Sequence, residues 1–410
     1  MPRILHLPKW YPHHYDDQDG DFVARHIATI AAQPAVESAV VFAAVAREAL
    51  PRLVVREVAL GGPVPTWRYY YRARLTGIRA LDRTLKLLLW LGCALHGVRA
   101  ARRHWGGARP DVVHAHILLR TGLLAWLLRA ARGWPYVVTE QWTIYLPERR
   151  ADLGTLRRLL TGWVVRRAAA LHTVSRALAE ALAALGARTP RTVVIANVVD
   201  VELFRPLGPG QVAERQLLHV AAFNEAQKNL AGVLRVVAKL RPAWPGLRLR
   251  VAGYGPDEAQ LLRYADELGL LADGTVQWLG KLPHPAVAAE MQRATALVSF
   301  SRAETFGCVL LEARACGRPV VGVRAGSVPE LFEPAGAFGL LVAPNDEVGL
   351  AAALGQVLAA KPAQFEAARL RADAVARCSP AVVGAAFLAL YRQVLGQPAP
   401  DGGGTTFAGR

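Results

Sequence analysis

Short runs of apolar residues alternate with amphipathic stretches along most of this chain. The runs 39–45, 112–116, 135–139 and 296–300 are rich in Val, Leu and Ala, as expected of strands buried on both faces. The stretches 22–32, 176–185 and 309–316 follow such runs and have helical spacing. This alternation covers nearly all of residues 3–376 and predicts an α/β fold with two doubly wound parallel sheets.

The length of 410 residues is typical of two large domains. We expect one domain over residues 1–205 and a second over 206–376. Residues 380–394 are predicted to form a last helix, within a segment 377–396. Residues 397–410 are rich in Gly and Pro and are predicted to be a disordered tail.

The stretch 301–312 carries the most specific chemistry. It follows the apolar strand 296–300 and leads into a helix that Gly317 is expected to end. We expect the helix to start at Phe306, Gly307 and Cys308, so that the amides from Phe306 to Val309 point outward and suit a phosphate. Gly307 has no side chain, which would let an anion approach the backbone closely.

Two carboxylates flank this phosphate site. Glu304 lies beside it, where it would repel a phosphate but could hold the hydroxyl groups of a sugar. Glu312 lies further into the helix, where a carboxylate can accept both hydroxyls of a ribose. Taken singly, a capping acid and a solvated helix acid would explain them equally simply.

Together, the residues E-T-F-G-C-V-L-L-E-A-R-A-C-G-R-P-V-V from Glu304 onward form a far more specific pattern. It resembles the E-x7-E signature of the retaining glycosyltransferases of family four, and the resemblance extends over about residues 3–395. It implies the GT-B fold: two Rossmann-like domains facing each other across a cleft, with segment 377–396 returning to the first domain. It also implies transfer from a nucleotide-diphosphate sugar with no metal ion or other cofactor.

The resemblance assigns roles in the second domain. Lys228 would hold the diphosphate, but Ala222 and Phe223 stand where the family has a second cation, an Arg. Lys228 and Glu304 would act on the reacting sugar. The expected donor-binding residues are Lys228, Glu304, Phe306, Gly307, Cys308, Val309, Glu312, the turn glycines Gly253 and Gly255, and Gly280, where the family reads the base by backbone contacts.

In the first domain, the run D-V-V-H-A-H ending at His116 is very similar to the family's strand whose second His reaches the acceptor and the transferring sugar. His114 is expected to pack internally. Gly20 would lie in a glycine loop lining the cleft, with Asp21 capping the next helix. Gln141 stands where relatives often have a His, and an amide cannot titrate near neutral pH.

An alternative explanation exists for the acids of the first loop. Asp17, Asp19 and Asp21 form a D-x-D-x-D pattern, and three carboxylates would suit magnesium or manganese. Acids are common in loops, and the metal-dependent signature belongs to another fold. We therefore predict no metal site.

The formal charge of +17 is unevenly placed. Residues 1–200 hold 28 Lys and Arg against 14 Asp and Glu, a net +14, whereas residues 201–410 hold 21 against 18, a net +3. Residues 67–105 interleave basic and aromatic side chains, which suits either an interfacial helix on an anionic membrane or an amphipathic helix packed on the sheet. A nucleic-acid-binding protein would share the charge, but no recognisable reader motif accompanies it, so we expect no nucleic-acid partner.

The four cysteines show no C-x-x-C spacing, and the N-terminal apolar run is short for a signal peptide. Both features favour a cytoplasmic protein, and the basic and aromatic residues 67–105 would place it peripherally on the inner face of the plasma membrane. The expected function is retaining transfer of a sugar from a UDP- or GDP-sugar to a glycan, polysaccharide or polyprenyl-linked acceptor. A nucleotide-sugar epimerase or hydrolase of the same fold is the alternative enzyme.

Overall fold

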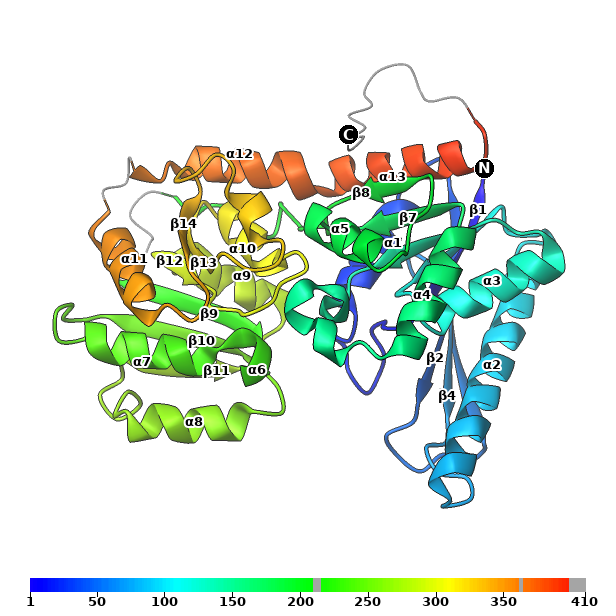
Figure 1. Cartoon of the computed structure of the whole chain (residues 1–410), viewed down its shortest axis with the longest axis horizontal. Helices are drawn as coiled ribbons and strands as arrows, with labels where there is room; N and C mark the ends of the chain where they lie inside the picture. Colours follow the sequence, from blue (N-terminus) through cyan, green and yellow to red (C-terminus); the bar gives the residue numbers. More distant parts are fainter. Residues whose placement is uncertain (209–214, 361–363, 398–410) are drawn as a thin grey trace.

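The structure is a computed structural model that describes residues 1–208, 215–360 and 364–397. Two largely parallel sheets lie side by side, each covered by helices, and the helices α12 (Ala367–Cys378) and α13 (Pro380–Val394) run along both (Figure 1). The two-domain GT-B architecture is therefore confirmed. Most of the predicted tail, residues 398–410, lies outside the described residues.

The first sheet has eight strands in the order β3-β4-β2-β1-β5-β6-β7-β8. Its strands are β1 (Arg3–Pro8), β2 (Glu37–Val45), β3 (Val54–Ala59), β4 (Thr66–Tyr71), β5 (Val112–His116), β6 (Tyr136–Glu140), β7 (Ala170–Thr173) and β8 (Thr192–Val194). Its helices are α1 (Asp21–Ala31), α2 (Arg79–His104), α3 (Thr121–Arg132), α4 (Thr155–Arg167) and α5 (Arg176–Ala184), with short 3-10 helices η1 (Thr143–Tyr145) and η2 (Pro147–Asp152).

The second sheet has six strands in the order β11-β10-β9-β12-β13-β14. They are β9 (Gln216–Ala222), β10 (Arg248–Tyr254), β11 (Val276–Gly280), β12 (Ala296–Val298), β13 (Val320–Val323) and β14 (Gly339–Val342). The helices around it are α6 (Glu225–Lys228), α7 (Leu230–Leu240), α8 (Glu258–Glu267), α9 (His284–Arg293), α10 (Cys308–Ala315) and α11 (Glu347–Ala359), with the 3-10 helix η3 (Val328–Phe332).

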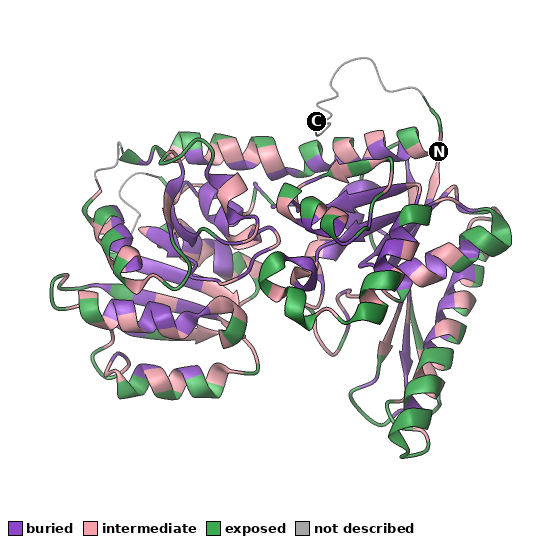
Figure 2. Cartoon of the chain, in the orientation of Figure 1, coloured by how far each residue is buried: buried purple, intermediate pink, exposed green. Residues whose placement is uncertain are grey.

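The prediction of a basic and aromatic helix over 67–105 is wrong for the first part of that range. Residues Thr66–Tyr71 form β4, and Trp67, Tyr69 and Tyr71 are buried in the core instead of facing a membrane. β3 pairs with β4 antiparallel at the sheet edge, so this sheet is not wholly parallel. The N-terminal half of α2 projects beyond the sheet and is largely exposed (Figure 2).

The chain ends with α12 (Ala367–Cys378) and α13 (Pro380–Val394). Residues Ala367–Val394 are apolar and long enough to cross a membrane by length and composition alone, with a mean hydropathy of 1.5 in the most apolar window. However, Val383, Phe387 and Tyr391 are buried with Ile4 and Val137 of the first sheet in one core cluster. The apolar face of α13 is thus covered by the first domain, as expected for a core helix.

Candidate active site

Lys228 and Glu304 meet where the second sheet reverses its strand order. β9 and β12 are neighbours, but their connections leave in opposite directions along the sheet, and α/β proteins bind ligands at such points. Lys228 ends α6 just after β9, and Glu304 lies in the loop after β12. Their side chains form an ion pair with Lys228 Nζ 2.5 Å from Glu304 Oε1. The fold therefore joins two residues that the sequence places 76 positions apart.

Arg302 holds these two loops together. Its Nη2 donates to Asn229 Oδ1 at 2.7 Å and its Nη1 to the Glu225 carbonyl at 2.7 Å. Its backbone N–H also donates to the Gln227 carbonyl at 2.7 Å. No role for Arg302 could be predicted from the sequence, because its partners are backbone and amide oxygens from a distant loop. It does not replace the missing Arg near Ala222, since it is already engaged with the protein.

The helix that follows the Glu304 loop starts later than predicted. α10 begins at Cys308, and Gly307 precedes it as the N-cap with φ 81°. Phe306 therefore lies before the helix and is buried, so its amide is not in the first turn. The amides of Cys308 and Val309 remain the ones at the positive end of the helix. Burial raises the pKa of the Cys308 thiol to about 12, so this group is a neutral neighbour.

Glu312 has a partner that the sequence did not suggest. Its carboxylate is 5% exposed, and Arg25 of α1 in the first domain contacts its Oε1 at 3.0 Å through Nη1. Arg25 also pairs with Asp21 at 3.2 Å, while its Nε has no partner among the described residues. The predicted ribose ligand therefore joins the two domains in this structure.

Besides Gly307, the predicted donor-site glycines are Gly253, Gly255 and Gly280, and their surroundings differ. A Cβ on Gly253 would lie 1.9 Å from the Ala221 carbonyl oxygen, and one on Gly255 would lie 2.5 Å from that of Phe223. These glycines let the loop after β10 pack on the loop after β9. Gly280 has φ 64° and open space around the Cβ position, so the backbone conformation is what favours glycine there.

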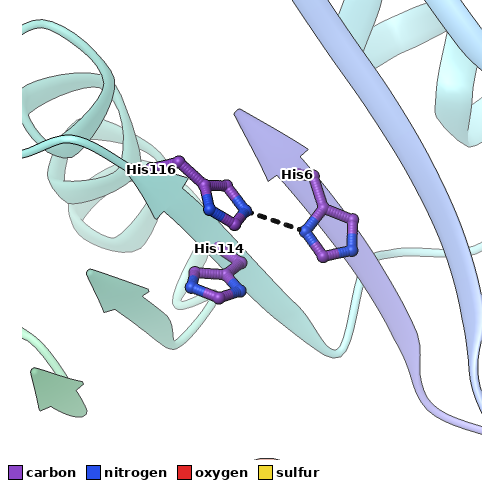
Figure 3. A group of neighbouring side chains, drawn as sticks. All are labelled: His6, His114 and His116. Atoms are coloured by element: carbon purple, nitrogen blue, oxygen red, sulfur yellow. Dashed lines mark hydrogen bonds between the residues drawn. The ribbon is translucent and has the colours of Figure 1, made fainter. Parts of the chain in front are cut away.

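Three histidines come together at the centre of the first sheet, on β1 and β5 (Figure 3). His116 Nε2 lies 3.1 Å from His6 Nδ1, and both rings are fully buried. The Tyr391 hydroxyl lies 2.6 Å from His114 Nδ1, and His114 Nε2 lies 2.6 Å from Thr139 Oγ1. His114 is thus a packed, hydrogen-bonded residue. His116, predicted to reach the acceptor, has no exposed surface here.

This cluster has the ring nitrogens close enough to hold a metal ion, within 4.8 Å of one another. However, both nitrogens of His6 are occupied, one by His116 and one by Ser38 Oγ at 3.3 Å. Both nitrogens of His114 are occupied too. A metal would have to displace these hydrogen bonds, so the donor set fits a hydrogen-bonded network better than a metal centre.

The loop after β1 contacts the second domain instead of gathering its acids. Asp17 pairs with Lys281 at 2.5 Å, Asp21 pairs with His284 at 3.1 Å, and Asp19 lies 3.5 Å from His13. Each acid has its own cationic or imidazole partner, which disfavours the alternative metal site.

The packing of this part of the first domain shows which residue caps α1 and what surrounds Gly20 and Gln141. Asp21 does not cap α1, because Gly20 is the N-cap with φ 62° and Asp21 is the first helical residue. A Cβ on Gly20 would lie 2.5 Å from the Trp10 backbone, so Gly20 is packed against the protein itself. Gln141 is 7% exposed and its Nε2 lies 3.4 Å from His26 Nδ1.

Glu140 was not singled out from the sequence, yet it organises the end of the first sheet. Its carboxylate is fully buried and accepts the backbone N–H groups of Leu118, Gln141 and Trp142 at 2.8–2.9 Å. Burial raises its pKa, and the three N–H groups act against that rise. An acid directly after a buried strand was the available signal.

Comparison with known families now defines the class. The family described as "Glycosyl transferases group 1" matches residues 214–360, and the family "Glycosyl transferase 4-like domain" matches residues 23–198. The two matches fall on the two sheets. The chain therefore belongs to the group 1 and 4-like glycosyl transferases, which confirms the resemblance found in the sequence.

Curated relatives include a glycogen synthase of Mycobacterium tuberculosis, 32% identical over 289 residues that cover 66% of this chain and 65% of the relative. A D-inositol 3-phosphate glycosyltransferase of Mycolicibacterium paratuberculosis is 34% identical over 284 residues, covering 64% of this chain and 62% of the relative. The chain thus matches somewhat less than two thirds of the length of these relatives.

Solved structures show the same fold over nearly the whole chain. Sucrose-phosphate synthase from Thermosynechococcus elongatus superposes with a TM-score of 0.75 at 21% identity, covering 97% of this chain and all of that one. HepE of Anabaena, solved in complex with UDP, gives a TM-score of 0.70 at 18% identity, covering 96% of this chain and all of that one.

Proposed function

We propose that this protein is a retaining glycosyltransferase that moves a sugar from a nucleotide-diphosphate sugar to a lipid-linked or polysaccharide acceptor. The observation that carries the proposal is the pairing of Lys228 with Glu304 beside the N-terminus of α10, at the point of strand reversal in the second sheet. A cation and helix amides stabilise a leaving diphosphate, and a carboxylate beside them holds sugar hydroxyls.

The family match and the UDP bound to a structural neighbour support a nucleotide-sugar donor. In this structure the Glu304 carboxylate pairs with the Lys228 ammonium group. A bound diphosphate would take over Lys228, which would release the Glu304 carboxylate to the sugar. Glu140, the buried acid at the end of the first sheet, accepts three backbone N–H groups, so it is unsuited to act as a covalent nucleophile.

The exposed half of α2 supports an acceptor at a membrane. Ile78, Leu81 and Leu88 are 49–62% exposed, and Leu85 continues their i, i+3, i+7 spacing on one helix face. Arg79, Arg83 and Lys86 lie on the same segment. We propose that residues 78–88 dock on an anionic membrane surface. A cavity of about 790 Å³ lies beside this helix, against β3, and contains none of the predicted donor or acceptor residues.

Thermal unfolding with and without nucleotides tests the donor site. We expect UDP or GDP to raise the Tm by several degrees, because a ligand at 100 times its Kd stabilises by about 2.7 kcal/mol. Lys228→Ala should remove the shift, whereas the matched Lys239→Ala, at an exposed lysine of α7, should retain it. The absence of a shift with any nucleoside diphosphate would overturn the proposal.

Mass spectrometry with donor sugars and candidate acceptors then separates transfer from its rivals. A transferase yields a glycosylated acceptor, whereas an epimerase or hydrolase consumes the donor without one. We expect transfer to persist in excess chelator, because the proposed diphosphate partners are Lys228 and backbone amides. Loss of transfer in chelator, restored by manganese, would contradict the metal-free site.

A further inference from the structure

A second point of strand reversal lies in the first sheet, between β1 and β5. The backbone continues from β1 into Lys9 and Trp10 and from β5 into the loop 117–120. The Lys9 N–H donates to the His116 carbonyl at 3.2 Å, which fixes the two loops side by side. Ligands of α/β domains bind at this kind of position.

Cationic side chains converge here on one aromatic ring. Lys9 Nζ lies 3.9 Å from the centre of the Trp142 ring, and the Arg157 guanidinium lies 4.8 Å from it. Trp10 meets Trp142 edge to face at 5.6 Å. Lys9, Trp10, Trp142 and Arg157 are all partly buried, so the cations are held in place while the cluster remains accessible.

The charge of this cluster is not balanced by the protein. Within the described ranges, Lys9 Nζ has no hydrogen bond or ion pair, and Arg157 Nη1 is buried without a partner. Burial lowers the pKa of Lys9 to about 8, with Glu140 opposing and the charges of Arg157 and Arg120 adding to the effect. The acid near Lys9, Glu140, is fully buried and already accepts hydrogen bonds from three backbone N–H groups. Lys9 and Arg157 are therefore two cations with one enclosed carboxylate nearby.

The loop after β5 is held in an unusual backbone conformation at the same place. Ile117 has φ 72° and Arg120 has φ 69°, although neither is glycine. The conformation of Ile117 is enforced by its N–H, which donates to the Thr139 carbonyl at 2.7 Å, and that of Leu118 by Glu140. A β-branched residue is costly in this region, and such positions cluster at binding sites.

We propose that Lys9 and Arg157, with the Trp142 ring, form the acceptor subsite of this enzyme and select an acceptor that carries a phosphate group. The inference rests on the proposed glycosyltransferase function and names the chemistry of its acceptor. The cations bind the phosphate, and the exposed part of the Trp142 ring packs against the sugar or the isoprenoid next to it. The phosphate can belong to a soluble sugar phosphate or to a lipid carrier.

Isothermal titration calorimetry on the full chain tests this subsite, with UDP or GDP present in saturating amount so that the donor site is closed to the probe. The probes are glucose, glucose 6-phosphate and farnesyl phosphate. We expect both phosphates to bind at least tenfold more tightly than glucose. Lys9→Gln and Arg157→Gln should each weaken phosphate binding about tenfold or more, because each removes a charge-assisted contact.

Arg158→Gln is the matched control, since Arg158 is the next residue of α4, is exposed and should leave phosphate affinity unchanged. Tighter binding of farnesyl phosphate would assign the phosphate to a lipid carrier, and tighter binding of glucose 6-phosphate to a soluble acceptor. Equal affinity for glucose and glucose 6-phosphate, or unchanged affinity in both variants, would overturn the subsite. Failure of every nucleotide to bind would instead overturn the donor function, leaving phosphate selectivity measurable.

Discussion

At the scale of single residues, contacts between distant segments hold the candidate site together: Lys228 pairs with Glu304, and Arg25 with Glu312. Lys228, Glu304 and Glu312 lie in segments with a recognisable pattern, so their positions could be predicted. Arg25 and Arg302 act through partners 287 and 73 residues away, and no local pattern reports such contacts. The full burial of His116 could not be predicted either. Strand alternation indicates on which face of the sheet a side chain lies, but not how far it is exposed.

Substitution of Glu312 and of Glu304 should change different kinetic parameters. Glu312→Ala should raise the KM for the donor about ten- to a hundredfold, because a lost hydrogen bond to a charged group costs about 1.5–3 kcal/mol. Glu304→Ala should mainly lower kcat, because its contacts strengthen as charge develops on the sugar. Calorimetry with the free nucleoside diphosphate decides the matter: equal weakening by both variants would contradict this division of labour.

The Arg25 contact gives that experiment a control. Arg25→Ala removes the same ion pair as Glu312→Ala but leaves the carboxylate in place. If Glu312 binds ribose, Arg25→Ala should retain nucleotide affinity that Glu312→Ala loses. If both variants lose it equally, the ion pair itself would be the determinant of binding.

Buried histidines should make the fold sensitive to acid. Burial lowers the pKa of His6 and His172 to about 3 and that of His26 and His219 to about 4. Since the unfolded chain binds protons near pH 6.5, folding stability is fully present above that pH and falls as the pH drops toward the folded values. At pH 5 each such histidine costs roughly 2 kcal/mol.

Thermal unfolding between pH 7.5 and 4.5 measures this effect. We expect the Tm to change little down to about pH 6.5 and then to fall steeply. A Tm that stays constant down to pH 4.5 would show that these rings are protonated in the folded protein at no cost.

At the scale of elements, periodicity located most strands and helices, but not every role. α13 occupies Pro380–Val394, the range expected from the sequence. The sequence-based prediction of a helix is wrong at β4, where aromatic and basic residues are interleaved from Trp67 to Arg72. Both a strand and a basic aromatic surface can show this pattern. Only the pairing of β4 with β2 and β3 identifies it as part of the sheet. The start of α10 shifted because Gly307 adopts a left-handed conformation that ends the loop.

The exposed half of α2 should bind anionic vesicles. Co-sedimentation should be strong with anionic lipid, weak with neutral lipid and reduced by salt. The triple variant R79Q/R83Q/K86Q should bind about a hundredfold more weakly, since each basic residue near the surface contributes about 1 kcal/mol.

The matched control is R129Q/R132Q/R166Q, which removes the same charge from α3 and α4. Binding to neutral vesicles as strong as to anionic ones, or equal loss in the control, would contradict docking through residues 78–88.

At the scale of the whole molecule, the two domains are joined by contacts from the first loop and α1. Gln18 donates to the Leu282 carbonyl at 2.9 Å, and Asp17, Asp21 and Arg25 pair with residues of the second domain. Sequence could predict two domains but not this set of pairs, because each joins residues more than 260 positions apart. Through Arg25, the first domain also contacts Glu312, the predicted ribose-binding residue.

Weakening these pairs should separate the domains. The double variant Asp21→Asn and Arg25→Gln should have a larger radius of gyration by small-angle X-ray scattering, and high salt should enlarge the wild type similarly. Arg99→Gln, at an exposed position of α2, should change nothing. An unchanged radius in the double variant would mean that the remaining contacts between the domains, among them Asp17 with Lys281 and Gln18 with the Leu282 carbonyl, suffice to hold the arrangement.

The return of α13 to the first sheet also constrains the order in which this protein can be made. Val383, Phe387 and Tyr391 complete the core around Ile4 and Val137, and Tyr391 bonds His114 on β5. A ribosome delivers β1 long before α13, and domains usually fold as they emerge. The first domain must therefore wait until α13 has been synthesised to close its core, while the second domain can finish folding before it.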